Sequence, residues 1–225
     1  MKMNNIFKNL FIFIFTNNML NTKIKNINLE TPFLNASGVF CKTKEQLLSL
    51  EKNNFTGGIV SKSCTLEKRD GNPHPIYWDD NETLSINSSG LPNMGYNYYI
   101  DPHLTNQFSK PYFVSISGLC IEDNLKIISE SIKNKRITSI ELNLSCPNVI
   151  GKPQIGYDFE AMDIILGKVN DLINKRDKND PVFTFGVKLP PYFDFSHFEK
   201  AANIINKYDI DFITCINSLG NGLVV

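Results

Sequence analysis

The chain has 225 residues, 42% hydrophobic and 20% charged, which excludes disorder as the main state because a chain of this kind can bury a sizeable core. Its 23 basic and 23 acidic residues cancel, so we expect no global attraction to nucleic acid or anionic lipid, and small neutral or anionic ligands are favoured instead. The five cysteines are widely spaced without a CxxC, and the three histidines show no metal-ligand spacing; this predicts a reduced, intracellular, metal-free protein.

Residues 1–18 are expected to form an extension outside the fold, with Met19 as an alternative start. The apolar run Leu10 to Phe15 follows two lysines, but it is short for a signal-peptide core and far too short for a membrane span. It also leads into asparagines rather than a small-residue cleavage site. We therefore expect a cytoplasmic protein without a membrane segment, folded as one domain over residues 19–225.

Short apolar runs alternate with segments of helical period along the rest of the chain. The runs read as strands buried on both faces, as in parallel sheets, and are Phe33 to Ala36, Gly58 to Lys62, Tyr112 to Ser117, Ser139 to Leu144, Phe183 to Leu189 and Phe212 to Asn217. The helical segments are Ile121 to Ile132, Phe159 to Leu172 and Phe198 to Tyr208. This alternation predicts an α/β fold.

Polar residues stand at the carboxyl ends of successive predicted strands. They are Lys62, Ser63, Ser117, Asn143, Ser145, Cys146, Lys188, Asn217 and Ser218. A barrel gathers all such ends around one opening, whereas an open doubly wound sheet gathers its ligand groups mainly at one switch point. One shared site is the simpler account, so we predict a (β/α)8 barrel type with about six of the eight βα units present.

The stretch from Thr65 to Asn97 is rich in glycine and proline and too long for an ordinary connection, which is typical of a functional loop or lid. Within it, Asn87 to Asn93 is an amide-rich turn that could hydrogen-bond a planar amide, although these residue types also simply make turns.

Cys146 follows a strand end where alternation places Asn143 and Ser145 on one side. A thiol with an ordinary pKa of about 8.5 has a usable thiolate fraction near neutrality, so Cys146 could be a nucleophile or a general base. The alternative is a small buried residue before a proline turn, and the residues alone leave both open. The absence of a histidine nearby in the sequence weakens the nucleophile interpretation.

Two lysines also stand at predicted strand ends. Lys62 offers a positive charge, and the small residues Ala36 to Gly38 permit close approach of a flat ligand. Taken singly, however, each is better explained by an ordinary role, a snorkelling lysine and a glycine turn. Lys188 lies in an apolar run, where an ammonium is costly without an anionic partner. The hypothesis that Lys188 faces a bound anion or acceptor therefore has the same weight as the hypothesis that it does not.

Together these motifs resemble one family, the fumarate-using class 1A dihydroorotate dehydrogenases, which are flavin enzymes of pyrimidine biosynthesis. The resemblance extends from about Asn21 to the last residue. The segments that carry it are Asn35 to Gly38, Ser61 to Ser63, Thr65 to Arg69, Gly90 to Asn93, Asn143 to Asn148, Gly151 to Gln154, Tyr157 to Ala161, Lys188 to Asp194 and Asn217 to Gly222.

The resemblance implies FMN-dependent oxidation of (S)-dihydroorotate to orotate in UMP biosynthesis, with fumarate reoxidising the flavin in the same site and a cytosolic homodimer. Cys146 would remove the proton from C5 while C6 delivers a hydride to N5 of FMN. The implied substrate residues are Lys62, Asn87, Gly90, Leu91, Asn143, Asn148, Asn217 and Ser218. The implied FMN residues are Ala36, Ser37, Gly38, Lys62, Ser63, Asn143 and Lys188, the last facing the N1/O2 edge of the ring.

Three features depart from the family pattern. Ser89 and Ile76 stand where the family usually has Met and Arg, which bears on packing beside the substrate and on the charge of the lid. The chain also ends after the sixth predicted strand, whereas barrels of this kind frequently build the phosphate site from the loops after strands seven and eight. We therefore expect a truncated product. The competing hypotheses are a non-catalytic fragment, possibly pairing with a full-length copy, and a reductase of another pyrimidine.

Overall fold

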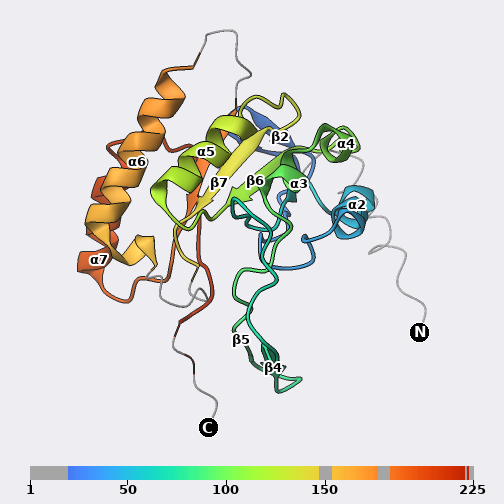
Figure 1. The fold of residues 1–225 in the computed structure, drawn as a ribbon, viewed down its shortest axis with the longest axis horizontal. Coiled ribbons are helices and arrows are strands. Elements are labelled where there is room, and N and C mark those ends of the chain that lie inside the picture. The colour runs from blue at the N-terminus through green and yellow to red at the C-terminus, as the bar shows by residue number, and fades with distance from the viewer. Residues whose placement is uncertain (1–19, 147–153, 177–182, 221, 223–225) are drawn as a thin grey trace, which may run out of the picture.

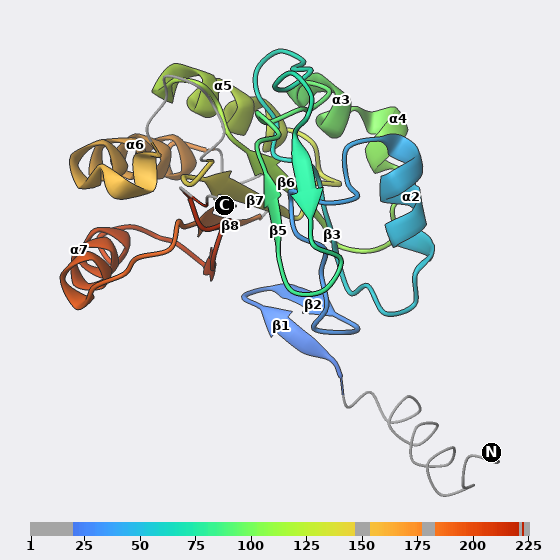
Figure 2. The same ribbon diagram turned by 90° about the horizontal axis from the view of Figure 1, so that it is seen from below.

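A five-stranded parallel sheet forms the centre of the computed structural model, which describes residues 20–146, 154–176, 183–220 and 222. Its strands, in spatial order, are β3 (Ile59–Val60), β6 (Tyr112–Ile116), β7 (Ser139–Asn143), β8 (Thr184–Lys188) and β9 (Phe212–Thr214). Spatial order equals chain order, so the sheet winds in one direction without the reversal of a doubly wound sheet. Figure 2 shows the helices in an arc around it, which is the arrangement of part of a barrel.

The three predicted helices are confirmed as α5 (Ile121–Ser131), α6 (Phe159–Asn174) and α7 (Phe195–Ile205). Asp158 and Asp194 begin α6 and α7 by accepting hydrogen bonds from backbone N–H groups of the first turn. Four further elements were not predicted: α2 (Lys44–Lys52), α3 (Tyr96–Ile100), α4 (Pro102–Thr105) and the 3-10 turn η1 (Ile155–Tyr157). The helices cover the outer face of the sheet (Figure 1).

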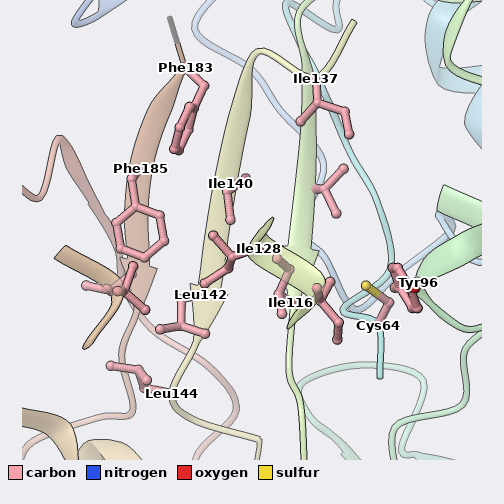
Figure 3. Close-up of a cluster of buried hydrophobic side chains, with 14 of the residues drawn as sticks. Cys64, Tyr96, Ile116, Ile128, Ile137, Ile140, Leu142, Leu144, Phe183 and Phe185 are labelled. Carbon is pink, nitrogen blue, oxygen red and sulfur yellow. The ribbon is translucent and has the colours of Figure 1, made fainter. Parts of the chain in front are cut away.

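The main core lies between the helices and the outer face of the sheet. Alternate residues of one strand, such as Ile140 and Leu142 of β7, point to this side together with Phe185 of β8 and Ile128 of α5 (Figure 3). All four are at most 2% exposed. Burying each of them contributes roughly 1.5–3 kcal/mol, so this layer holds the strands and helices together.

A second, smaller cluster covers the inner face of the sheet at the amino-terminal ends of the strands. The hairpin β1 (Thr22–Ile24) and β2 (Ile27–Leu29), which was not predicted, buries Ile27 and Leu29 against Val60 and Phe113. The ring of Phe212 lies against Gly186, where an added Cβ would be 2.4 Å from that ring. Only glycine fits at that position, and the inner face is therefore closed at this end.

The predicted first strand, Phe33 to Ala36, is wrong as a strand, because only the single parallel bridge from Leu34 to Gly58 forms. The side chain of Asn35 takes the place of the backbone pairing. Its Nδ2 donates to Val60 O at 2.7 Å and its Oδ1 accepts from Val60 N at 2.9 Å. The edge of β3 is thus satisfied without a neighbouring strand.

The long stretch from Thr65 to Asn97 contains regular structure that the sequence analysis missed. The strands β4 (Tyr77–Asp79) and β5 (Ser85–Asn87) form an antiparallel hairpin that projects away from the sheet (Figure 1). A bridge between Arg69 and Asn93 closes its base. Each strand has only three residues, too few for alternation to reveal it.

Candidate active site

A buried polar cluster occupies the inner face of the sheet at the carboxyl ends of the strands. Asn143 Nδ2 donates to Ser63 Oγ at 3.0 Å, and Asn143 Oδ1 accepts from Ser145 Oγ at 3.0 Å and from Asn217 Nδ2 at 3.4 Å. Asn143 therefore connects residues that follow β3, β7 and β9. The prediction that these strand ends meet at one site is confirmed.

Two ammonium groups border this cluster. Lys188 is 6% exposed and its Nζ lies 3.4 Å from Ser37 Oγ, while Lys62 Nζ donates to Gly38 O at 3.0 Å. Burial lowers the pKa of Lys62, and the thiols of Cys41 and Cys146 act in the opposite direction. An anion or an electron-rich ring edge is the ligand that two partly desolvated cations favour.

A cavity of about 250 Å³ adjoins Cys146. Leu91, Ser117 and Asn143 line it, together with Gln154 at the start of η1. Gln154 Oε1 is buried and has no hydrogen-bond partner among the described residues, so it can accept a hydrogen bond from a ligand N–H. The cavity thus combines two thiols, two amides, the carboxylate of Asp158 and an apolar wall, which suits a small planar polar molecule.

The predicted site residues on the loop before α3 divide into two groups. Gly90 is buried with φ +71°, and an added Cβ would lie 2.3 Å from Asn72 Oδ1, so glycine is required there and Leu91 is held at the cavity. Asn87 is exposed at the end of β5 and is not among the residues that line the cavity.

The remaining predicted residues are placed as follows. Ser218 is exposed, and its backbone N–H donates to Asn217 Oδ1 at 2.8 Å. Ala36 and Gly38 are exposed, and a Cβ at Gly38 would meet no atom within 4 Å, so the chain leaves open space there. Asn148, like the predicted extension over residues 1–18, lies outside the described residues.

Three residues of the cluster were missed in the sequence analysis. Glu141 is 5% exposed, and its two carboxylate oxygens accept from Ser115 Oγ and from Thr214 Oγ1, each at 2.7 Å. Glu141 precedes Asn143 by two residues and therefore shares its face of β7. A carboxylate on the same face of the strand as a predicted site residue was the signal that could have revealed it.

Within residues 20–146, 154–176 and 183–220, no cluster of three or more His, Cys, Asp or Glu side chains is suited to hold a metal ion. No helix in this part of the chain has the length and apolar character needed to cross a membrane. None of the five cysteines is in a disulfide.

The sequence model of the family described as dihydroorotate dehydrogenase matches residues 19–225. The chain belongs to the dihydroorotate dehydrogenase family. A family member from Streptococcus agalactiae, described as putative dihydroorotate dehydrogenase A (fumarate), is 47% identical over 210 residues, covering 92% of this chain and 64% of the relative. Dihydroorotate dehydrogenase A (fumarate) of Lactococcus lactis is 45% identical over 211 residues, covering 92% of this chain and 65% of the relative. The chain thus spans slightly under two thirds of the length of these dihydroorotate dehydrogenases.

Solved dihydroorotate dehydrogenase structures confirm the fold. The enzyme from Eimeria tenella in complex with ferulenol superposes with a TM-score of 0.70 at 16% identity, over 95% of this chain and 66% of that one. Its ligand-free form superposes with a TM-score of 0.71 at 17% identity, over 90% of this chain and 62% of that one. The prediction of an α/β chain that forms part of a (β/α)8 barrel is therefore confirmed, with five parallel strands and one bridge in place of six strands among the described residues.

Proposed function

We propose that this chain carries the substrate site of an FMN-dependent dihydroorotate dehydrogenase that oxidises (S)-dihydroorotate to orotate in UMP biosynthesis and uses fumarate as electron acceptor. The observation that carries the proposal is that Cys146 and Asn143 share one cavity, with the ammonium of Lys62 close enough to the thiol to influence it. The fumarate-dependent relatives at 45–47% identity support the choice of acceptor.

The residues near Ser37 fit the isoalloxazine of FMN. Among the described residues, Ser37 provides the one oxygen within hydrogen-bond distance of the buried Lys188 ammonium, which has three donors. Gly38, the next residue after Ser37, leaves open space for a flat ring. Lys188 and Ser37 would therefore hold the ring edge. When bound, FMN supplies hydride acceptance from the substrate and passes the electrons to fumarate.

The chain's own groups then have distinct tasks. Cys146 Sγ would take the proton from C5 of dihydroorotate, and a nearby ammonium such as that of Lys62 stabilises a thiolate. The amides of Asn143 and Asn217 would hydrogen-bond the N–H and C=O groups of the substrate ring, which a dry cavity would otherwise leave unsatisfied. Leu91 forms the apolar wall that excludes water from the thiol.

Replacement of the thiol tests this proposal. In flavin-loaded protein we expect Cys146→Ser to lower turnover about 10²–10⁴-fold, the usual contribution of a general base, while orotate still perturbs the flavin spectrum. Cys215→Ser, at an exposed cysteine that does not line the cavity, is the matched control and retains turnover. Unchanged turnover of Cys146→Ser at neutral pH would remove Cys146 from the role of base.

We also propose a cytoplasmic homodimer, as the similarity to class 1A enzymes implies, and sedimentation of the purified chain measures its oligomeric state. The competing proposal of a non-catalytic fragment is separated by flavin content. A yellow chain after purification with FMN supports the enzyme. A soluble, colourless chain supports the fragment.

A further inference from the structure

The hydroxyl of Tyr99 lies between two loops that belong to the proposed site. Tyr99 is part of α3 and is 0% exposed. Its Oη accepts a hydrogen bond from Met94 N–H at 3.3 Å and donates one to Lys42 O at 2.9 Å. An amide N–H can only donate and a carbonyl can only accept, so the direction of both bonds is fixed. One buried hydroxyl therefore joins two loops that are far apart in the chain.

The first loop is the 37–42 segment, which contains the proposed flavin residue Ser37. It is attached to the residues after β3, because Ser63 N–H donates to Ser37 O at 3.1 Å. Lys62 N–H also donates to Cys41 O at 3.0 Å. Within the segment, Phe40 has φ +53°, a left-handed conformation that few residues other than glycine adopt. Such a conformation depends on contacts from outside the segment, and the hydrogen bond from α3 supplies one at its far end.

The second loop is the 91–95 turn, which begins with the cavity residue Leu91 and contains Met94. Asn93 is 0% exposed and closes this turn from inside. Its Nδ2 donates to Leu91 O at 3.0 Å, and its Oδ1 accepts from Gly95 N–H at 2.8 Å. These bonds brace the turn, so a hydrogen bond to its Met94 N–H also holds the apolar wall at Leu91.

The phenol of Tyr99 is itself held by the core. Tyr112 of β6 is 0% exposed, and its hydroxyl donates to Tyr99 O at 3.1 Å, which fixes α3 against the sheet. Burial raises the pKa of Tyr99 well above its ordinary value, so the hydroxyl keeps its proton and remains a donor to Lys42 O at neutral pH. The two loops thus share an anchor whose own position is set by the core.

We propose that Tyr99 is a positioning residue: its hydroxyl holds the 37–42 segment and the 91–95 turn in a fixed relation, and thereby sets the distance between the proposed flavin ring and the apolar wall of the proposed substrate cavity. The identity of the two ligands rests on the proposed function, whereas the bridge between the two loops does not. Tyr99→Phe keeps the ring in the core and removes the one group that contacts both loops.

The neighbouring Tyr98 provides a matched control. Its hydroxyl accepts from Lys44 N–H at 2.6 Å at the start of α2, so it holds α2 rather than the 91–95 turn. Tyr98→Phe and Tyr99→Phe therefore remove the same group from adjacent residues, and the bridge is broken in the second variant alone.

Amide hydrogen exchange of the flavin-free chain tests the bridge. The reporters are the N–H groups of Gly95 and Ser63, which lie on the two sides of the bridge and are bonded to Asn93 and Ser37 rather than to Tyr99. We expect Tyr99→Phe to speed the exchange of both about 2- to 10-fold relative to core amides of α6, the range that one lost hydrogen bond allows.

Tyr98→Phe is expected to leave the exchange of Gly95 unchanged. An unchanged Gly95 or Ser63 amide in Tyr99→Phe would overturn the proposal. Equal acceleration of Gly95 in the two variants would also overturn it, because a lost hydroxyl would then act through packing and not through the bridge.

A measurement on the wild-type chain keeps the proposal testable if Tyr99→Phe does not fold. With ¹³C-labelled tyrosine, the Tyr99 hydroxyl proton is expected to give a slowly exchanging signal with a cross-peak to the Met94 N–H. A Tyr99 hydroxyl proton that exchanges with water as fast as that of the exposed Tyr77 would contradict the bridge.

Turnover per bound flavin separates positioning from mere stability. A variant that is only less stable yields less folded protein, but each flavin that it binds works at the wild-type rate. We expect Tyr99→Phe to lower kcat per bound flavin about 2- to 10-fold, because misplaced reacting groups slow the chemical step, and Tyr98→Phe to retain it. An unchanged kcat per bound flavin would overturn the positioning role. A chain that binds no flavin would contradict the proposed function, while the exchange of Gly95 and Ser63 would still decide the bridge.

Discussion

The two faces of the central strands differ sharply although both are buried. On the outer face, Leu142 and Phe185 pack among apolar side chains of the helices, whereas on the inner face Glu141, Asn143 and Lys188 belong to a hydrogen-bonded cluster. Apolar contacts are non-directional and depend mainly on volume, while buried hydrogen bonds demand specific partners and geometry. The comparison teaches that one strand sequence carries stability on one side and the arrangement of a site on the other.

The largest effect is expected on the outer side, and two adjacent residues of α6 sharpen the contrast. Ile165 is 0% exposed in the core and Ile164 is 46% exposed. We expect Ile165→Ala to lower the free energy of unfolding by about 2–5 kcal/mol because it leaves a cavity. Urea unfolding measures this change. Ile164→Ala is the control, with an expected change within about 0.5 kcal/mol, and equal losses in the two variants would contradict the core as described.

A smaller loss in the free energy of unfolding is expected from a substitution on the inner face. Asn143→Ala removes one of the partners of Ser63 Oγ and the side-chain acceptor of the Ser145 backbone N–H, and a buried polar group left without its partner costs roughly 1–3 kcal/mol. The urea midpoint measures the loss, and Asn206→Ala at the exposed end of α7 serves as control. If Asn143→Ala were as stable as the control, the inner cluster would not constrain the fold.

The pH dependence of stability gives an effect of about 1 kcal/mol. Burial raises the pKa of the Cys41 thiol from 9.0 to about 11, with Lys62 and Lys188 acting in the opposite direction. The folded chain keeps this proton where the unfolded chain loses it, so the contribution is complete below about pH 9 and is lost as pH rises toward the folded pKa. We expect a loss of about 1 kcal/mol between about pH 8 and about pH 10 that Cys41→Ala abolishes. Parallel pH profiles of unfolding in the two proteins would show that this thiol does not contribute.

The smallest effect is expected on the β4–β5 hairpin, which belongs to neither face. Tyr77 is 61% exposed there, so Tyr77→Ser should change the free energy of unfolding by at most about 0.5 kcal/mol. A loss of several times that size in urea unfolding would mean that the hairpin is packed in solution against another surface.

Much of the scaffold was predictable because its signals are local. The helical periods located α5, α6 and α7, and the continuous apolar runs located the strands β6, β7 and β8 to within a residue or two. The strand at Phe33 to Ala36 was wrong because the Asn35 amide pairs with Val60, and the sequence pattern does not distinguish backbone pairing from side-chain pairing. The three-residue hairpin strands were missed because they are too short to show a period.

The sequence predicted which residues form the candidate site better than it predicted how they contact one another. Polar residues at strand ends indicated that Ser63, Asn143 and Lys188 meet, and the structure brings them together. Glu141 and Gln154 were not predicted as site residues, because the role of a buried carboxylate or amide depends on partners far away in the chain. Ser115 and Thr214, the partners of Glu141, come from strands that the sequence does not place beside it.

The order of strands and helices, the α/β class and the residues at the carboxyl ends of the strands were determined by the sequence itself, since periodicity and residue type are properties of neighbouring positions. Only the tertiary structure decided that the sheet winds in one direction, that Asn35 replaces a strand, and that Lys188 lies beside Ser37 and Glu141 beside Ser115. These features depend on contacts between residues 25 or more positions apart, which form only when the whole sheet has closed around its inner face.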